Sequence, residues 1–276
     1  MGAMNDFQRV LDTTERHLLT LKASGVRFLP IQSETLSRLG EPPSVLEIET
    51  PSETLAVEET SLSQPAQPTV DIEMSMEELR QRALVCMKCP HLVKSRKNVV
   101  FGVGSVRAQL MFVGEAPGAE EDSQGEPFVG AAGQLLTRII KTMGLSRETV
   151  YIANILKCRP DTPGQSSGNR KPTGDEMKTC LPYLLAQIDL IRPKVLVALG
   201  ATAIEGLLGA GGSIGKLRGK FQTFRDIPLM PTFHPAYLLR NQALSEKRKV
   251  WEDMLQVMER LQMPISEKQR SYFLAA

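Results

Sequence analysis

From about Met76 onward, short apolar runs alternate with segments whose apolar residues recur at helical spacing. The apolar runs predict strands at residues 109–113, 150–155, 195–199 and 228–233. The amphipathic segments predict helices at residues 133–143, 175–191, 201–208 and 244–261. Apolar strands that alternate with helices are typical of a parallel sheet covered on both faces. The pattern therefore predicts an α/β fold with three α/β/α layers around a central, mostly parallel four-stranded sheet.

The first 75 residues follow a different pattern. Residues 5–23 place apolar side chains near one helical face, and residues 33–39 predict a second short helix. Residues 41–75 are rich in Pro, Ser, Thr and Glu and contain no Lys or Arg, which is the composition of a disordered linker. These patterns divide the chain into an N-terminal helical extension (1–40), an acidic linker (41–75), the α/β domain (76–262) and a C-terminal tail (263–276).

Charge is distributed unevenly along the chain. Residues 1–79 carry 5 Lys or Arg against 14 Asp or Glu, whereas residues 80–276 carry 28 against 17. A basic globular part beside an acidic arm suggests a polyanionic partner such as nucleic acid. A chance excess on a solvated surface gives the same count, so charge alone leaves both interpretations open.

The apolar runs are too short to cross a membrane, because none approaches the roughly 18 residues that a spanning helix requires. The N-terminus also lacks the basic-then-apolar pattern of a signal peptide. We therefore expect a cytoplasmic protein that makes no membrane contact, and we expect a monomer.

The four cysteines form a candidate metal-ligand set. Cys86 and Cys89 have the C-x2-C spacing that lets two thiolates bind one centre, and Cys158 and Cys180 follow later in the chain. Such a set in a cytosolic chain argues against disulfides. Zinc and iron–sulfur clusters both accept four thiolates, so spacing does not separate them, and two chance buried thiols are the third alternative.

Three polar segments follow predicted strands. The run Gly114–Gly130 follows the strand at 109–113 and holds five carboxylates and one aromatic residue, Phe128. Asn154 lies at the end of the second strand, and His234 follows the last strand in the segment P-T-F-H-P-A-Y-L-L. Because α/β folds bind ligands at the carboxyl ends of their parallel strands, the run Gly114–Gly130 is a candidate binding loop, and the place of His234 at a strand end favours a functional role for it.

These motifs resemble family 4 of the uracil-DNA glycosylase superfamily, its iron–sulfur bacterial and archaeal branch. The resemblance covers about residues 78–262, and the four cysteines stand where that family binds a 4Fe-4S cluster. It is carried by G-E-A-P-G-x-x-E-D from Gly114, G-x-P-F-V-G from Gly125, Y-I-A-N-I-L-K-C-R-P from Tyr151, the basic segment Lys216–Lys220 and H-P-A-Y-L-L from His234.

The resemblance implies a monofunctional hydrolase that acts on uracil-containing DNA, single- or double-stranded. It would cleave the N-glycosidic bond of a flipped-out deoxyuridine and leave an abasic site, the first step of base-excision repair. The N-terminal extension lies outside the resemblance, and we expect it to be dispensable or to bind a protein partner.

The resemblance also implies roles for individual residues. Phe128 would stack on the flipped base. The Asn154 amide would donate to uracil O4 and accept from N3–H, which rejects cytosine. His234 would donate to uracil O2 as negative charge develops there. Glu121 would exclude the methyl group of thymine, and Glu115 is the expected catalytic carboxylate, near the sugar or the water.

The remaining expectations concern the walls of the site and its DNA contacts. Gly114 and Ala116 would contribute to the substrate pocket. Family 1 enzymes carry an Asp where this chain has Ala116, so the anchor of the water stays open between Glu115 and main-chain carbonyls. Leu238 would enter the DNA stack as a wedge. The expected phosphate contacts are Lys157, Arg159, Arg218, Lys220 and Arg240.

The cluster would be structural, because hydrolysis needs no electron transfer and Cys158 lies only four residues after Asn154. Two alternatives to the enzyme remain. One is a relative that binds uracil-DNA covalently without turnover, which carries G-E-Q-P-G and a nucleophilic His after a basic insertion. The other is a non-catalytic DNA-binding module associated with a polymerase.

Overall fold

The computed structural model describes residues 69–161, 169–209 and 212–274. The helices expected at 5–23 and 33–39 and most of the expected linker lie outside these residues. The chain separates into two units, Met1–Leu62 and Ser63–Ala276, and the second contains the α/β domain. Its first helix, α3 (Thr69–Leu84), begins seven residues before the expected domain boundary at 76. The acidic residues at the start of this helix resemble those of the expected linker in composition.

The described sheet contains the four predicted strands and two more at its edges. It has the order β1-β3-β2-β4-β6-β5. The central strands β3 (Tyr151–Asn154), β2 (Leu110–Gly114), β4 (Val195–Leu199) and β6 (Ile227–Thr232) run parallel, as predicted. The edge strands β1 (Val103–Gly104) and β5 (Gln222–Phe224) run antiparallel to their neighbours. Both are too short and too exposed to produce an apolar run.

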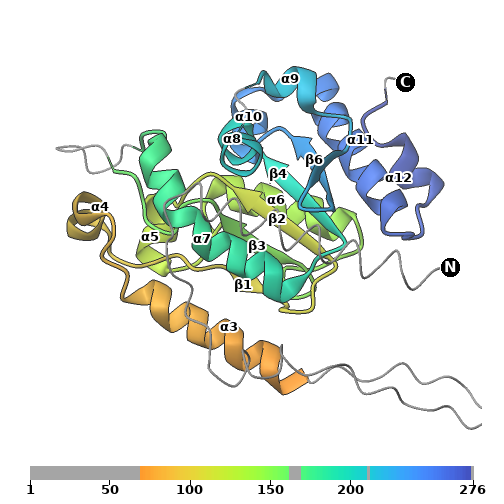
Figure 1. Cartoon of the computed structure of the whole chain (residues 1–276). Helices are drawn as coiled ribbons and strands as arrows, with labels where there is room; N and C mark the ends of the chain where they lie inside the picture. Colours follow the sequence, from red (N-terminus) through yellow and green to blue (C-terminus); the bar gives the residue numbers. More distant parts are fainter. Residues whose placement is uncertain (1–68, 162–168, 210–211, 275–276) are drawn as a thin grey trace, which may run out of the picture. The chain divides into compact units, whose positions relative to one another are not determined.

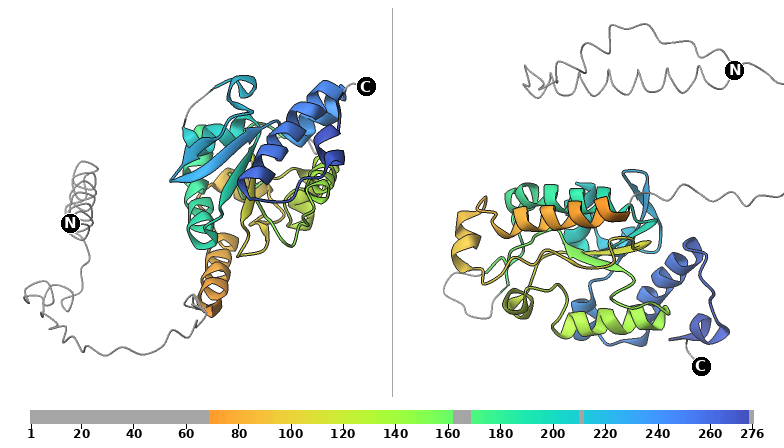
Figure 2. Two further views of the ribbon diagram at one scale, coloured as in Figure 1. Left: turned by 90° about the vertical axis from the view of Figure 1, so that its right-hand side faces the viewer. Right: turned by 90° about the horizontal axis from the view of Figure 1, so that it is seen from below.

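The helices form a layer on each face of the sheet (Figures 1 and 2). The four predicted helices are present as α6 (Ala131–Thr142), α7 (Gly174–Ile191), α8 (Ala201–Leu208) and α11 (Leu244–Arg260). Their residues join two separate apolar clusters, one containing α3, α7 and α8 and the other α6 and α11. Met111 and Val113 belong to the first cluster and Leu110 and Phe112 to the second, as the two-residue period of a strand requires. The three-layer prediction is therefore confirmed.

Five further helices of the described residues are short, and their lengths explain why periodicity did not predict them. They are α4 (Pro90–Ser95), α5 (Ala119–Gln124), α9 (Ile214–Leu217), α10 (Pro235–Arg240) and α12 (Glu267–Ser271). A helix of four to six residues completes too few turns to show a 3.6-residue period. Helix α5 lies inside the polar run Gly114–Gly130, where the sequence predicted no helix.

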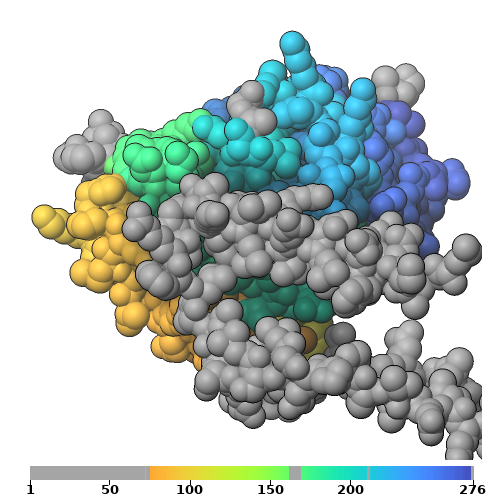
Figure 3. All heavy atoms as spheres, in the orientation of Figure 1, coloured from red at the N-terminus to blue at the C-terminus, as the bar shows by residue number. Residues whose placement is uncertain are grey.

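The C-terminal segment is part of the folded unit. The indole Nε1 of Trp251 donates to the Gln269 carbonyl oxygen at 2.6 Å, and the Tyr272 ring packs edge-on against Trp251. Arg248 Nη1 donates to the carbonyl oxygens of Arg270 and Tyr272, both at 2.8 Å. The segment expected to be a C-terminal tail (263–276) therefore contacts α11 through several of its residues. In Figure 3 the blue C-terminal residues lie on the side opposite the yellow residues of α4.

Candidate functional site at the carboxyl edge of the sheet

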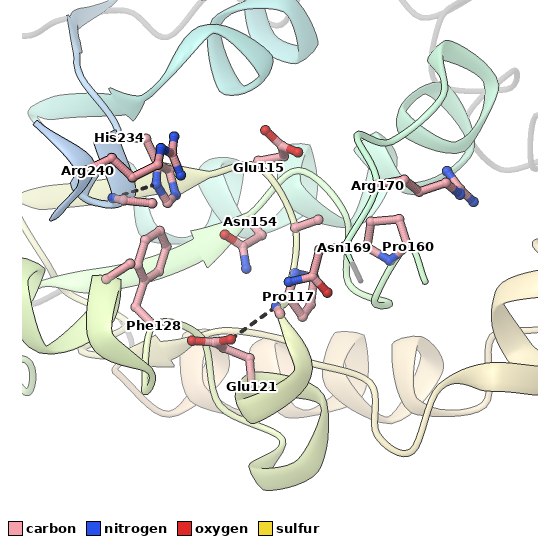
Figure 4. Close-up of a pocket in the computed structure, with 14 residues that line it drawn as sticks. Glu115, Pro117, Glu121, Phe128, Asn154, Pro160, Asn169, Arg170, His234 and Arg240 are labelled. Atoms are coloured by element: carbon pink, nitrogen blue, oxygen red, sulfur yellow. Dashed lines mark hydrogen bonds between the residues drawn. The ribbon is translucent and has the colours of Figure 1, made fainter. Parts of the chain in front are cut away.

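A cavity of about 380 Å³ opens at the carboxyl ends of the central strands. Six of the residues that line it were predicted from the sequence: Glu115, Ala116, Glu121, Phe128, Asn154 and His234. They come from three separate segments, and Figure 4 shows their side chains around one space. The fold therefore brings these residues together at the strand ends, while the chemical role of each residue stays a prediction.

Gly114 lies behind the pocket and does not line it. A Cβ atom at this position would lie 2.4 Å from Asn154 Oδ1 and 2.5 Å from Phe128 Cζ. Glycine therefore lets the Asn154 amide and the Phe128 ring approach the end of β2.

Asn154 ends β3 and is 2% exposed. Its Oδ1 atom is the one buried side-chain nitrogen or oxygen without a hydrogen-bond partner in the part of the chain that the structure describes. A buried acceptor left without a donor costs roughly 1–3 kcal/mol. Because native proteins pair nearly all such groups, an unpaired acceptor in a pocket indicates that a ligand supplies the donor.

His234 caps the short helix α10, and its Nδ1 accepts the Ala236 N–H at 3.1 Å. Burial and, to a smaller extent, the nearby Arg240 together lower the pKa of His234 to about 4. The imidazole is therefore neutral at pH 7, and because Nδ1 accepts, Nε2 carries the proton. His234 thus presents an N–H donor that the sequence alone could not assign.

Phe128 and His234 lie on the same side of the cavity. Their ring centroids are 5.6 Å apart with an angle of 31° between the ring planes. Figure 4 shows the Phe128 ring beneath His234, across the cavity from Glu115. A flat ligand entering the cavity therefore meets an aromatic face beside a neutral imidazole.

Glu121 holds the main chain of its own wall. Its Oε2 accepts the Gly118 N–H at 3.1 Å, and its Oε1 accepts the N–H groups of Val129 and Gly130, both at 3.0 Å. Helix α5 begins at this point, so Glu121 fixes both ends of the segment that carries Phe128. Glu115 is half-buried on the opposite side, and its carbonyl oxygen accepts the Leu156 N–H at 3.1 Å.

The chain matches the family model of the uracil DNA glycosylase superfamily over residues 101–255. It is 46% identical to the type-4 uracil-DNA glycosylase of Thermotoga maritima over 66% of this chain and 92% of that protein. It is 41% identical to the type-4 uracil-DNA glycosylase of Sulfurisphaera tokodaii over 72% of this chain and 90% of that protein. The chain belongs to the type-4 uracil-DNA glycosylase family. Identity to a type-5 uracil-DNA glycosylase of Pyrobaculum aerophilum is lower, at 27% over 57% of this chain and 80% of that protein.

Three residues that line the cavity were not predicted as site residues from the sequence. Pro160, Asn169 and Arg170 also line the cavity. Arg170 pairs with Glu176 at 2.5 Å, and Asn169 Oδ1 accepts from Arg159 Nε at 2.8 Å. Pro160 ends the motif that begins at Tyr151, but Asn169 and Arg170 belong to no motif and meet the pocket only through the fold.

Two of the expected phosphate contacts are wrong. Lys157 is 1% exposed, and its Nζ donates to the Asn154 carbonyl oxygen at 3.0 Å and to Gln187 Oε1 at 2.6 Å. Arg218 pairs with the buried Asp253 at 2.6 Å. Lys157 and Arg218 therefore pair with acceptors inside the protein. Lys220 and Arg240 are exposed, and Arg240 also lines the cavity.

The expected wedge Leu238 is 5% exposed, whereas its neighbour Leu239 is 37% exposed. Both belong to α10, and a short helix points successive side chains in different directions. Leu238 packs into the protein and cannot enter DNA in this conformation.

The four cysteines of this type-4 family member line one small cavity of about 20 Å³. Arg96 Nη1 donates to Cys158 Sγ and the Lys157 main-chain N–H donates to Cys180 Sγ, both at 3.2 Å. Burial raises the pKa of the Cys89 and Cys158 thiols, and raises that of Cys180 to about 11. Within the described residues, no three His, Cys, Asp or Glu side chains surround one point as a single bound ion requires.

No helix in the described part of the chain is long and apolar enough to cross a membrane.

Proposed function

We propose that this protein is a monofunctional uracil-DNA glycosylase that starts base-excision repair. It hydrolyses the N-glycosidic bond of a flipped-out deoxyuridine and leaves an abasic site. The observation that carries this proposal is the buried, unpaired Oδ1 of Asn154 in a pocket beside Phe128 and His234. Membership of the type-4 family supports it.

Uracil presents the donor that Asn154 lacks. The N3–H group of uracil donates to Oδ1, and the amide N–H of the same side chain donates to uracil O4. Cytosine carries an acceptor at N3 and a donor at the C4 position, so both contacts would become unfavourable. A site built to pair a buried group in this way discriminates strongly against a base that cannot do so.

His234 stabilises the leaving base. When the glycosidic bond breaks, negative charge develops on uracil O2, and the neutral imidazole donates its Nε2–H to that oxygen. A donor in such a position lowers the activation free energy by roughly 3–4 kcal/mol. The main-chain N–H of Ala236 supports this role, because it keeps Nδ1 as the acceptor.

The sugar and the water lie toward Glu115 in our proposal. Ala116 provides no carboxylate, so Glu115 and main-chain carbonyls are the candidates that stabilise the positive sugar and orient the water. Glu121, whose carboxylate is fixed by three main-chain N–H groups, excludes the methyl group of thymine.

Phe128 stacks on the flipped base, and a stack of this kind contributes roughly 1–3 kcal/mol. Leu239, exposed on α10 next to the pocket residue Arg240, takes the role of the wedge. Arg240 and Lys220 contact phosphates.

We propose that Cys86, Cys89, Cys158 and Cys180 hold a 4Fe-4S cluster. Four thiols around one cavity, with N–H donors to two sulfurs, fit the hydrogen-bonded thiolates of iron–sulfur proteins. The bound cluster supplies a rigid cross-link and no reaction step. It ties α4 and α7 to the segment that follows Asn154, and so supports the strand end that carries the base-reading amide.

The test uses a single-stranded oligonucleotide with one uracil, followed by alkali and a denaturing gel. We expect strand cleavage at the uracil by the wild-type protein and none by Asn154→Ala. DNA binding without cleavage by the wild type would overturn the enzyme proposal in favour of a non-catalytic DNA-binding module. A band shifted under denaturing conditions would instead indicate the covalent relative. Iron content and absorption near 400 nm separate the cluster from zinc.

A further inference from the structure

Phe128 has a backbone conformation that a large side chain rarely adopts. Its φ angle is +55°, in the left-handed region that favours glycine. Phe128 is nevertheless buried, and its ring faces the cavity near His234. A strained residue of this kind persists only where the surrounding contacts hold it, and such residues cluster at functional sites.

Arg147 holds the carbonyl side of this strained segment. It lies in the turn between α6 and β3, where its Nη2 donates to the Pro127 carbonyl oxygen at 2.8 Å and its Nη1 to that of Phe128 at 3.0 Å. A planar guanidinium is suited to two such parallel bonds. Burial lowers the pKa of Arg147, and nearby glutamates oppose this effect, but an arginine remains charged at pH 7.

Glu121 holds the amide side of the same segment. Its Oε1 accepts from the next two residues, Val129 and Gly130. Four consecutive residues are therefore held from opposite sides, their carbonyl oxygens by a cation and their N–H groups by an anion. A pair of charged groups that bonds main-chain atoms fixes the peptide planes on both sides of the Phe128 Cα, and with them the direction of its side chain.

The neighbouring glycines show how closely this segment is packed. A Cβ on Gly133 would lie 1.9 Å from both the carbonyl carbon and the carbonyl oxygen of Phe128, and one on Gly114 would lie 2.5 Å from Cζ of its ring. Main chain and ring are thus enclosed on the sides away from the cavity. The Arg147 guanidinium reaches these carbonyls from a turn outside the strained segment.

We propose that Arg147 is a positioning residue for the flipped base: it locks Phe128 in the strained conformation that presents the ring to uracil. This inference rests on the proposed function and adds to it a residue that does not line the pocket. Arg147 does not line the cavity, so in this proposal it acts on the flipped base through the position of Phe128.

The test is a double-mutant cycle between Arg147→Met and Phe128→Ala, measured as kcat and KM on a uracil-containing oligonucleotide. Arg147→Met keeps the length of the side chain and removes both donors. Arg138→Met, on the exposed face of α6, removes the same charge from the neighbouring surface and is the matched control. Thermal melting of each variant shows whether it is folded.

We expect Arg147→Met to lower kcat/KM by roughly tenfold or more, because small displacements of a positioned group have effects of this size. The same substitution should have little effect in the Phe128→Ala background. If Arg147 acts by positioning the Phe128 ring, its loss changes nothing once that ring is absent. Arg147→Lys, which keeps a charge and can reach one carbonyl, should recover part of the activity. Arg138→Met should match the wild type.

Equal losses from Arg147→Met in both backgrounds would overturn the inference, because they would indicate a general effect on the fold. A wild-type value of kcat/KM for Arg147→Met would overturn it as well. If Arg147→Met does not fold, the same double-mutant cycle is measured with Arg147→Lys and Phe128→Ala, and equal losses of kcat/KM in both backgrounds again overturn the inference. These outcomes leave the proposed function standing, which fails only if the wild-type protein releases no uracil.

Discussion

Two polar side chains near the end of β3 are buried equally deeply and have opposite surroundings. Lys157, at 1% exposure, uses its amine to bond the Asn154 carbonyl oxygen and Gln187. Asn154, at 2% exposure, has a side-chain oxygen with no partner among the described residues. Lys157 lies near the cysteines, where its main-chain N–H donates to Cys180 Sγ, whereas Asn154 lines the pocket.

The difference separates a region built for stability from a region built for a ligand. On the cysteine side, Gln187 extends the pairing to the Phe101 carbonyl oxygen and the Tyr151 hydroxyl group. In the pocket, one acceptor is kept unpaired, at a free-energy cost that only a bound donor removes. Substitutions on the two sides should therefore separate activity from stability.

The largest effect should come from Asn154→Ala. Because the site is built to pair uracil N3–H and O4, we expect kcat/KM for uracil release to fall by at least about 10³-fold. Stability should stay equal or rise slightly, since the substitution removes an unpaired buried oxygen. Single-turnover rates and urea denaturation check both parts. A large loss of stability would contradict the assignment of this group to the ligand.

His234→Ala should lower kcat by roughly 10²- to 10³-fold, the usual effect of removing one donor to a developing negative charge. Since the pKa of His234 is about 4, the group is neutral above about pH 5, and its titration should not limit activity between pH 5 and 8. A pH–rate profile of kcat measures this. An acid limb near pH 6.5 that disappears in His234→Gln would contradict the neutral donor.

The same pKa has a consequence for stability. Above about pH 6.5 the imidazole is neutral in both the folded and the unfolded state. As pH falls from about 6.5 to about 4, the unfolded state takes up the proton first, so the folded state loses stability over this range. His234→Ala should lose less stability than the wild type over these pH values in urea denaturation. Parallel curves would contradict a depressed pKa.

Lys157→Met should show the reverse of Asn154→Ala. The substitution keeps the volume but leaves two buried acceptors unpaired, so we expect a loss of about 2–3 kcal/mol in the free energy of unfolding. The activity of the folded fraction should change far less than in Asn154→Ala. Lys178→Met, on the exposed face of α7, is the matched control and should be neutral. Unchanged stability in Lys157→Met would contradict the claim that the buried hydrogen bonds of Lys157 stabilise the fold.

The smallest effect should come from Leu239→Ala. Loss of an exposed wedge should lower the rate on duplex DNA by about tenfold and leave single-stranded DNA nearly unaffected, because only a duplex must be unstacked. Leu238→Ala, which removes buried apolar atoms, should instead lower stability. Equal rates on both substrates for Leu239→Ala would remove it as the wedge.

The sequence predicted the elements that repeat a strong pattern. Strands β2, β3, β4 and β6 are continuous apolar runs, and α6, α7, α8 and α11 are long enough to show a helical period. The family resemblance, rather than the strand pattern, implied that Phe128, Asn154 and His234 form one pocket. The structure confirms that these three side chains lie around one cavity.

What the sequence could not predict depends on burial and direction. Lys157 and Arg218 have the charge of phosphate contacts, but the fold turns both inward to acceptors distant in sequence, Gln187 and Asp253. Leu238 and Leu239 are identical residues, and only the orientation of α10 distinguishes them. Arg147 carries no motif, since its two partners are main-chain oxygens about 20 residues before it.

The central claim is that Asn154 Oδ1 accepts the N3–H of uracil. Single-turnover release of uracil and of 3-methyluracil from otherwise identical oligonucleotides, by the wild type and by Asn154→Ala, tests it most directly. The wild type should prefer uracil by about 10²-fold or more, and Asn154→Ala should lose most of that preference. The same preference in both proteins would show that Asn154 does not read the N3 position.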